Sequence, residues 1–242
     1  MKSKLILLAI LVAALSIGVT AQKVTITPKK ITYIRKKPNT DYRKTFAITY
    51  PKVKAATPAL SKKIEAALSY EKSFDFKLAE EMSEIQWLEN ATYDAVFNYG
   101  KVLSINLNIE GSGAYPDSFT HTVVVDTSTG TVQTAAMVFN DLEGLAAMVD
   151  KDLQRDIKQA ITELRKDPEM KDPDPATLFE GKIFSETDLE GFSVDGKGVT
   201  FHFEFGFPHV IQAAEPSGYY FYRWDQIKKY LKPGGLLTPL AR

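Results

Sequence analysis

The sequence predicts an α+β fold in which antiparallel strands pack against several helices. Three observations support this prediction. Apolar and polar residues alternate over 93–109 and again over 199–205, as in strands with one buried face. Between these regions, residues 142–164 repeat apolar side chains every three or four positions, as in an amphipathic helix. The chain has 242 residues and no cysteine, so it must be stabilised by its core rather than by disulfides.

The first 21 residues have the pattern of a cleavable secretory signal peptide. Lys2 and Lys4 form a short basic start, residues 5–17 are almost entirely aliphatic, and Val19-Thr20-Ala21 supplies small residues for cleavage. We therefore expect an exported, periplasmic or extracellular protein that begins at Gln22. The alternative is an uncleaved N-terminal membrane anchor, since about 17 apolar residues reach the lower limit for spanning a bilayer.

The charge balance restricts the classes of partner. The sequence has 30 lysine and arginine residues against 30 aspartate and glutamate residues, and loss of Lys2 and Lys4 leaves a slightly acidic chain. Nucleic-acid binding requires a basic surface, so this balance argues against it. No stretch after residue 21 is long and apolar enough to be transmembrane. The absence of cysteine excludes thiolate metal sites, and the sequence indicates no cofactor.

The N-terminal part predicts one strand and two helices. Residues 46–50 form a short strand that Pro51 is expected to stop. Thr57 is the expected N-cap of a helix that has Pro58 at its first position. The buried stripe of this helix is Leu60, Ile64, Ala67 and Leu68. A second helical segment has Leu78, Met82 and Ile85 on its apolar side, and its solvated face is expected to hold Glu80, Glu81 and Glu84.

The middle of the chain predicts an antiparallel sheet. Alternation over 93–99 and 103–109, with a turn between them, indicates two strands with one core face and one solvated face. The core face is expected to hold Tyr93, Ala95, Phe97, Tyr99, Leu103, Ile105, Leu107 and Ile109. A third strand over 119–126 turns at 127–130 and pairs with 131–134.

A long helix and a loop follow this sheet. Asn140 or Asp141 is the expected N-cap of a helix over 142–164. Residues 166–175 are charged and proline-rich, which is typical of a loop.

Alternation returns near the C-terminus. Residues 195–198 form a hairpin turn, and the next strand places Phe201, Phe203 and Phe205 in the core. Within residues 219–224, Tyr220, Tyr222 and Trp224 share one face. We expect this face to be core, although exposed aromatic rings here would suit a sugar or a protein partner.

The three histidines, His121, His202 and His209, are the first candidates for catalysis. None forms a pair with the spacing of a metal motif such as H-x-x-x-H. His202 and Glu204 share a strand face, which is interpreted as a polar outer surface; the alternative is a pair that binds metal or transfers protons. His121 is in phase with apolar strand residues and is interpreted as a histidine at the edge of the core. Gly111-Ser112-Gly113 lacks the pattern of a nucleophile elbow and is interpreted as a loop.

The segment Gly113-Ala114-Tyr115-Pro116-Asp117 resembles the Gly-Ala-His-Pro segment of a bacterial family catalogued as domain of unknown function 3298 (DUF3298). As in that family, a strand, an Asp-x-x-Thr-Gly turn at 126–130 and a helix follow. The family's closing pattern is similar to Phe192, Val194, Gly198, Phe201, Phe203, Pro208, Ala213, Ala214, Gly218, Tyr230 and Leu231. Two departures are Tyr115, where the family usually has histidine, and Phe207-Pro208-His209, which lacks the usual Pro-Tyr pair.

Residues 42–110 resemble the partner domain catalogued as 4163 (DUF4163), found at the start of certain peptidoglycan deacetylases. The two domains together form the ectodomain of lysozyme-sensing anti-sigma factors. The resemblance implies an N-terminal region over 22–110 and a DUF3298-like region over 111–242, packed as one unit. It does not imply catalysis, because the chemistry of the deacetylases belongs to a separate metal-dependent domain whose Asp and His motifs are absent here.

The loop over 111–118 is the expected binding site. Glycines let a backbone approach a partner closely, and a tyrosine offers a large ring and a hydroxyl at modest entropic cost. We therefore expect the ligand to be bound by Gly113, Tyr115, Pro116, Asp117 and His209, although the glycines and the proline would also serve simply to shape the connection.

The sequence thus predicts an exported, non-catalytic binding module of the cell envelope. Its expected partner is an envelope protein or a lysozyme-like protein, or else a peptidoglycan-type glycan. The alternative is an envelope glycan hydrolase or deacetylase that uses His202, Glu204 and Asp195.

Overall fold

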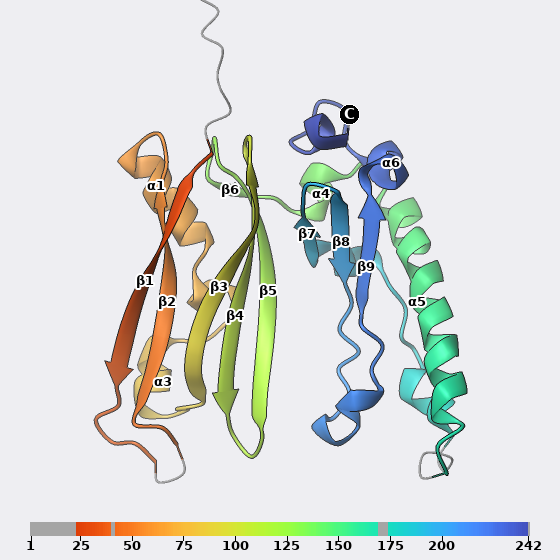
Figure 1. Cartoon of the computed structure of the whole chain (residues 1–242), viewed down its shortest axis with the longest axis horizontal. Helices are drawn as coiled ribbons and strands as arrows, with labels where there is room; N and C mark the ends of the chain where they lie inside the picture. Colours follow the sequence, from red (N-terminus) through yellow and green to blue (C-terminus); the bar gives the residue numbers. More distant parts are fainter. Residues whose placement is uncertain (1–22, 40–41, 169–173, 242) are drawn as a thin grey trace, which may run out of the picture.

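The computed structural model describes residues 23–39, 42–168 and 174–241. The expected α+β fold is confirmed. Two β-sheets stand side by side, and helices cover the far side of each (Figure 1). The expected signal peptide over 1–21 lies outside the described residues. Within the described ranges, no helix combines the length and the apolarity needed to cross a membrane.

The larger sheet comes from the first half of the chain. In spatial order its strands are β1 (Thr25–Ile34), β2 (Thr45–Lys54), β3 (Leu88–Tyr99), β4 (Val102–Ser112), β5 (Pro116–Asp126) and β6 (Thr131–Val132). Neighbouring strands are antiparallel except β2 and β3, which pair in parallel. The predicted antiparallel strands between residues 93 and 134 are therefore confirmed. Residues 110 and 111, between which the sequence divides the chain, both lie in β4.

Strand β2 does not stop at Pro51, as the sequence predicts, but continues to Lys54. Proline has no N–H, so in a central strand it interrupts the hydrogen-bond ladder with one of the two neighbouring strands. Here the parallel ladder between β2 and β3 involves only Ala47 and Ile48, so Pro51 has no strand neighbour on that side. On the other side it lies opposite Pro28 of β1. The missing N–H of Pro51 therefore interrupts no ladder with β3, and β2 continues beyond Pro51.

One face of the larger sheet is covered by the helices α1 (Pro58–Ala67), α2 (Tyr70–Ser73) and α3 (Leu78–Ser83). The predicted start of α1 is confirmed, because the Thr57 hydroxyl accepts a hydrogen bond of 3.1 Å from the Leu60 N–H. The predicted stripe of α1 faces the sheet. A first core results, whose buried members include Ile64, Leu68, Ile105, Leu107 and Val123.

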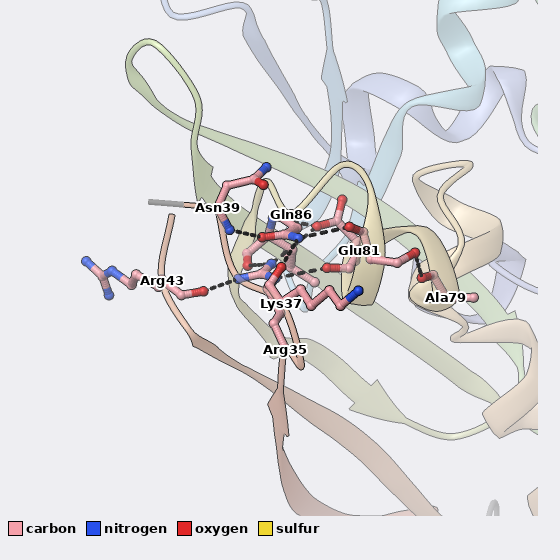
Figure 2. Close-up of polar contacts among 9 residues, drawn as sticks. Arg35, Lys37, Asn39, Arg43, Ala79, Glu81 and Gln86 are labelled. Carbon is pink, nitrogen blue, oxygen red and sulfur yellow. Dashed lines mark hydrogen bonds and ion pairs between the residues drawn. The ribbon is translucent and has the colours of Figure 1, made fainter. Parts of the chain in front are cut away.

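The expected solvated face of α3 is wrong at Glu81, which is 3% exposed and faces Arg35, itself 1% exposed (Figure 2). The nearest charged atoms of the two side chains, Arg35 Nη2 and Glu81 Oε2, are 3.5 Å apart. Arg35 also donates hydrogen bonds to the backbone carbonyls of Glu81, Arg43 and Leu88, at 2.9, 2.7 and 2.8 Å. In return, the Glu81 carboxylate accepts the N–H of Leu88 at 2.8 Å. Each charge is thus both paired and hydrogen-bonded, which makes its burial tolerable.

Gln86 extends this arrangement and is buried as well (Figure 2). Its side-chain amide donates to the carbonyls of Lys37 and Ser83 and accepts the N–H of Asn39, each at 2.9 Å. Gln86 has a φ of +54°, an uncommon conformation for a residue with a side chain. We refer to Arg35, Glu81 and Gln86 as the Arg35 cluster. Its hydrogen bonds hold the connection between β1 and β2 against α3 and the segment that joins α3 to β3.

The alternation predicted for β3 breaks at a register shift between Ala95 and Phe97. A β-bulge of this kind moves the following side chains to the opposite face. Tyr93 accordingly packs against the first core, whereas Phe97 packs against the second core on the other side of the sheet. Ala95 and Tyr99, which the sequence places in the core, are exposed.

The second half of the chain forms a smaller unit around the long helix α5 (Leu142–Leu164), whose N-cap Asp141 accepts the Gly144 N–H at 3.0 Å. Its antiparallel sheet contains β7 (Phe192–Val194), β8 (Gly198–His202) and β9 (Tyr219–Arg223). The remaining short helices and 3₁₀ turns are α4 (Ala135–Val138), η2 (Pro175–Phe179), η3 (Glu186–Glu190), η4 (His209–Ala214), α6 (Trp224–Ile227), η5 (Lys228–Tyr230) and η6 (Thr238–Ala241).

Aromatic side chains dominate the second core, which joins the smaller sheet to α5 and also includes Val102 and Val124 of the larger sheet. Phe201, Phe203 and Phe205 are buried as predicted, although β8 itself ends at His202. Tyr220, Tyr222 and Trp224 are also buried, so their interpretation as core is confirmed. The Tyr222 hydroxyl donates a 2.6 Å hydrogen bond to the Asp152 carboxylate on α5. Ser193, Thr200, His202 and Tyr219 of this sheet face residues of the larger sheet, and the Val194 N–H donates to the Ser104 hydroxyl of β4 at 3.1 Å.

Candidate binding site

The predicted binding loop is a tighter hairpin than expected. Strand β4 continues to Ser112 and β5 begins at Pro116, so only residues 113–115 form the connection. The Gly113 N–H donates to the carbonyl of Tyr115 at 3.1 Å, which closes the turn. The Asp117 carboxylate accepts the N–H of Ser118 at 2.8 Å. The Tyr115 side chain remains 59% exposed at the tip.

Tyr115 meets His209, although 93 residues separate the two in the sequence. Their rings are stacked, with centroids 4.8 Å apart and planes inclined by 13°. His209 begins η4, which lies near the tip of the β4–β5 hairpin at the lower end of the molecule in Figure 1. The structure therefore brings together two of the predicted binding residues from the two halves of the chain. Gly113, Pro116 and Asp117 lie beside them on the hairpin.

A polar cleft of about 320 Å³ lies between the two sheets. The larger sheet contributes side chains from β4 and β5, which include Asn106, Thr120, His121 and Thr122. The smaller unit contributes Thr187, Asp188, Glu190, Ser193, Thr200, His202, Glu204 and Tyr219. Hydroxyl, amide, imidazole and carboxylate groups thus face each other, and no lysine or arginine lines the cleft within the described residues.

His202 is a half-buried titratable group of the cleft. Its ring stacks on Tyr219, with centroids 4.5 Å apart and planes inclined by 17°. Burial lowers the pKa of His202 below its usual value, and the carboxylates of Glu204 and Glu215 only partly oppose that shift. Burial also lowers the pKa of His121, with Glu204 again opposing. Glu204 therefore lies within electrostatic reach of both histidines, and both imidazoles are biased toward the neutral form.

Asp195, the third member of the alternative catalytic set, has a different role. Its carboxylate accepts the N–H groups of Lys197 and Gly198, at 2.6 and 2.8 Å, and so stabilises the β7–β8 hairpin turn. It does not line the cleft that holds His202 and Glu204. The set that the sequence proposes for catalysis is therefore not brought together as a unit.

An aromatic groove of about 440 Å³ lies on the other face of the larger sheet, beside β5. Its lining includes Phe74, Phe76, Ile85, Trp87 and Phe119. Trp87 packs over Gly111, where any Cβ atom would collide with the Trp87 backbone and ring. His121 contacts Phe74 edge-on at the rim, as expected for a histidine at the edge of the core. No local sequence pattern predicts this groove, because most of its apolar residues come from the irregular segment between α2 and β3, which has no strong periodicity.

Within the described residues, no group of three or more histidine, aspartate or glutamate side chains is placed to hold a metal ion.

The fold is similar to solved members of the DUF3298 family. One is a family member from Bacteroides fragilis, matched with a TM-score of 0.53 and 15% identity over 91% of this chain and 97% of the other. A second is a DUF3298 family protein from Pseudomonas aeruginosa, matched with a TM-score of 0.54 and 11% identity over 88% of this chain and 97% of the other. No family model and no curated protein matches the sequence. The chain therefore shares the fold of these two structures.

Proposed function

We propose that this protein is an exported, non-catalytic binding module of the bacterial cell envelope. Its ligand would be a lysozyme-like protein or a cell-wall glycan, held at the polar cleft and at the Tyr115–His209 pair. Export is proposed from the signal pattern over 1–21. We also propose that residues 22–110 form a DUF4163-like region.

Two observations made together carry the proposal: Tyr115 stacks on His209, and a polar cleft lies between the same two halves of the chain. Both rings belong to connections held by sheets, and such loops are favoured places for recognition. Tyr115 is largely exposed, although burial would stabilise so large a ring. The cleft supplies hydrogen-bonding groups of several kinds around a space large enough for a small ligand or a side chain.

The second candidate is an envelope glycan hydrolase or deacetylase. It is favoured by one observation, the placement of Glu204 within electrostatic reach of His121 and His202 in one cleft. Release of reducing sugar or acetate from purified peptidoglycan would support this activity. Analysis for a bound divalent ion would separate a metal-dependent deacetylase from a binding module.

The first prediction tests the binding site with Tyr115→Ala. The probes are lysozyme, titrated by calorimetry, and purified peptidoglycan, measured by co-sedimentation. We expect the variant to weaken binding by about 1–2 kcal/mol, the range of an interface hot spot, while the melting temperature stays unchanged. Truncation removes an exposed ring, so folding should not depend on it.

The matched control is Tyr99→Ala, because Tyr99 is also an exposed strand-end tyrosine but lies at the opposite end of β3 and β4. This control should bind like the wild type. Equal affinities for the two variants would remove the β4–β5 hairpin from the site. Absence of binding to both probes by the wild type would contradict the proposed ligands.

A further inference from the structure

Strand β5 has a free edge along most of its length. It pairs with β4 from Pro116 to Asp126, but with β6 only at Val125 and Asp126. Among the described residues, no strand therefore pairs with the outer edge of residues 116–123. An unpaired edge of this kind presents a row of N–H and C=O groups to any chain that approaches it.

Two hydrogen bonds establish which residues present their backbone outward. The Thr127 N–H donates to Lys101, toward β4, and the Val124 carbonyl accepts the Gln133 N–H, on the outer side. Backbone groups alternate between the two edges of an antiparallel strand, and the β4–β5 register has no irregularity. Ser118, Thr120 and Thr122 therefore direct their N–H and C=O groups outward.

The edge lies between the polar cleft and the aromatic groove. Thr120, His121 and Glu204 line both of them. Side chains alternate between faces along a strand. Accordingly, Thr122 faces the polar cleft, whereas Phe119 lies in the aromatic groove and is 47% exposed. A strand added to this edge would send successive side chains alternately into the groove and into the cleft.

The two edges of the larger sheet differ in how they are protected. Natural proteins protect exposed edges with lysine, proline or bulges. The opposite edge strand, β1, contains Pro28, Lys29 and Lys30. Residues 117–124 of β5 contain no lysine, arginine or proline and no bulge. Of these two edges, only that of β5 lacks residues that would prevent another strand from pairing with it.

We propose that the β5 edge binds an extended polypeptide segment as an added strand. This inference rests on the proposed binding function and specifies its ligand as a protein segment rather than a glycan. The segment has apolar side chains for the aromatic groove at every second position. Basic side chains lie between them, because Asp188, Glu190 and Glu204 line the cleft and no lysine or arginine does so within the described residues. Glu190 and Asp188 already accept hydrogen bonds from Ala135 and Ser185, so Glu204 is the carboxylate best placed to meet the ligand.

The test uses a synthetic peptide of about eight residues in which lysine alternates with phenylalanine and valine, a length typical of a strand. Binding to the full chain is measured by calorimetry. The variant Thr120→Pro removes one outward N–H and should weaken binding at least about tenfold, as expected for a lost backbone hydrogen bond. The matched reference is Thr120→Val, which loses the same side-chain hydroxyl but keeps the N–H, so the proline variant should bind more weakly than the valine variant.

A second measurement does not depend on the folding of any variant. The same peptide, N-methylated on the alternate amides that would pair with β5, should bind the wild-type protein at least about tenfold more weakly. Equal affinity for the methylated and unmethylated peptides, or no binding of either, would overturn the inference. Binding of an N-acetylglucosamine oligomer in place of the peptide would also overturn it, but would leave the proposed envelope-binding function standing.

Discussion

The Arg35 cluster and the polar cleft both gather charged side chains, but they do so in opposite ways. In the cluster, Arg35 and Glu81 are almost fully buried, and their polar atoms are engaged with each other or with backbone groups. In the cleft, Glu204 is exposed, and it forms no hydrogen bond or ion pair with any described residue. The cluster connects distant segments of the chain and so stabilises the fold. The cleft leaves hydrogen-bonding groups available to a ligand.

The polar groups of the cluster are thus structural, whereas those of the cleft are candidates for binding. A buried charge that loses its partner is strongly destabilising. The main effect of a mutation in the Arg35 cluster should therefore be on the stability of the fold. An open carboxylate contributes little to folding, because water solvates it. Mutations in the two regions should therefore affect different measurements.

The largest effect is expected for Arg35→Ala. Removal of the guanidinium leaves the Glu81 carboxylate buried without its counter-charge and deprives three carbonyls of their donor. The free energy of unfolding should fall by about 3–5 kcal/mol, measured by urea denaturation. Glu204→Ala is the matched control from the cleft and should change it by less than about 0.5 kcal/mol. Similar losses in the two variants would break the comparison.

A comparable but somewhat smaller effect is expected for Phe203→Ala, which tests the core directly behind the cleft. Phe203 is buried against the rings of Phe184 and Phe205, whereas its neighbour Glu204 points outward. Truncation should cost about 3 kcal/mol, through lost apolar burial and the cavity that remains. An unchanged melting temperature would show that this segment does not pack in the described register.

The smallest effect concerns the histidines of the cleft. Burial lowers the pKa of His202 and, at the more exposed rim, of His121. The unfolded chain therefore binds protons more readily than the folded one. The contribution of these two histidines to the free energy of unfolding should be fully present above a pH of about 6.5, the usual histidine pKa. It should be lost progressively as the pH falls below that value.

The measurement is urea denaturation at a series of pH values for the wild type and for His202→Gln. The variant should lose less stability on acidification, because one of the two groups responsible is gone. Identical pH dependence in the two proteins would mean that His202 is not shielded from water in the folded state.

The predictable parts of the fold are those dictated by local periodicity. The Thr57 cap, the α5 stripe and the alternation in β4 depend on neighbours within a few positions, and each is present. The errors arise where distant residues decide the outcome. Glu81 resembles any solvated helical glutamate until Arg35 is placed beside it, 46 residues earlier in the chain. Pro51 would stop a strand with close neighbours on both sides, but β2 and β3 pair only briefly.

The candidate site shows the same division. The turn residues around Tyr115 identify an exposed tyrosine, but no local pattern predicts that its ring would stack on His209. The polar cleft forms only because the polar faces of two sheets meet, and each face alone looks like an ordinary solvated surface. The free edge of β5 depends on the shortness of β6, which a sequence pattern indicates only approximately.

The position of Trp87, packed over Gly111 at the aromatic groove, has a consequence for the fluorescence of the protein. The chain contains two tryptophans, and they occupy different surroundings. Trp87 borders the aromatic groove, whereas Trp224 is buried in the second core. Indole emission depends on the polarity of its surroundings, so the two fluorophores report on separate parts of the molecule. With Trp224 replaced by phenylalanine, the remaining tryptophan emission would come from the groove alone, and the protein would need no attached dye to signal occupancy beside β5.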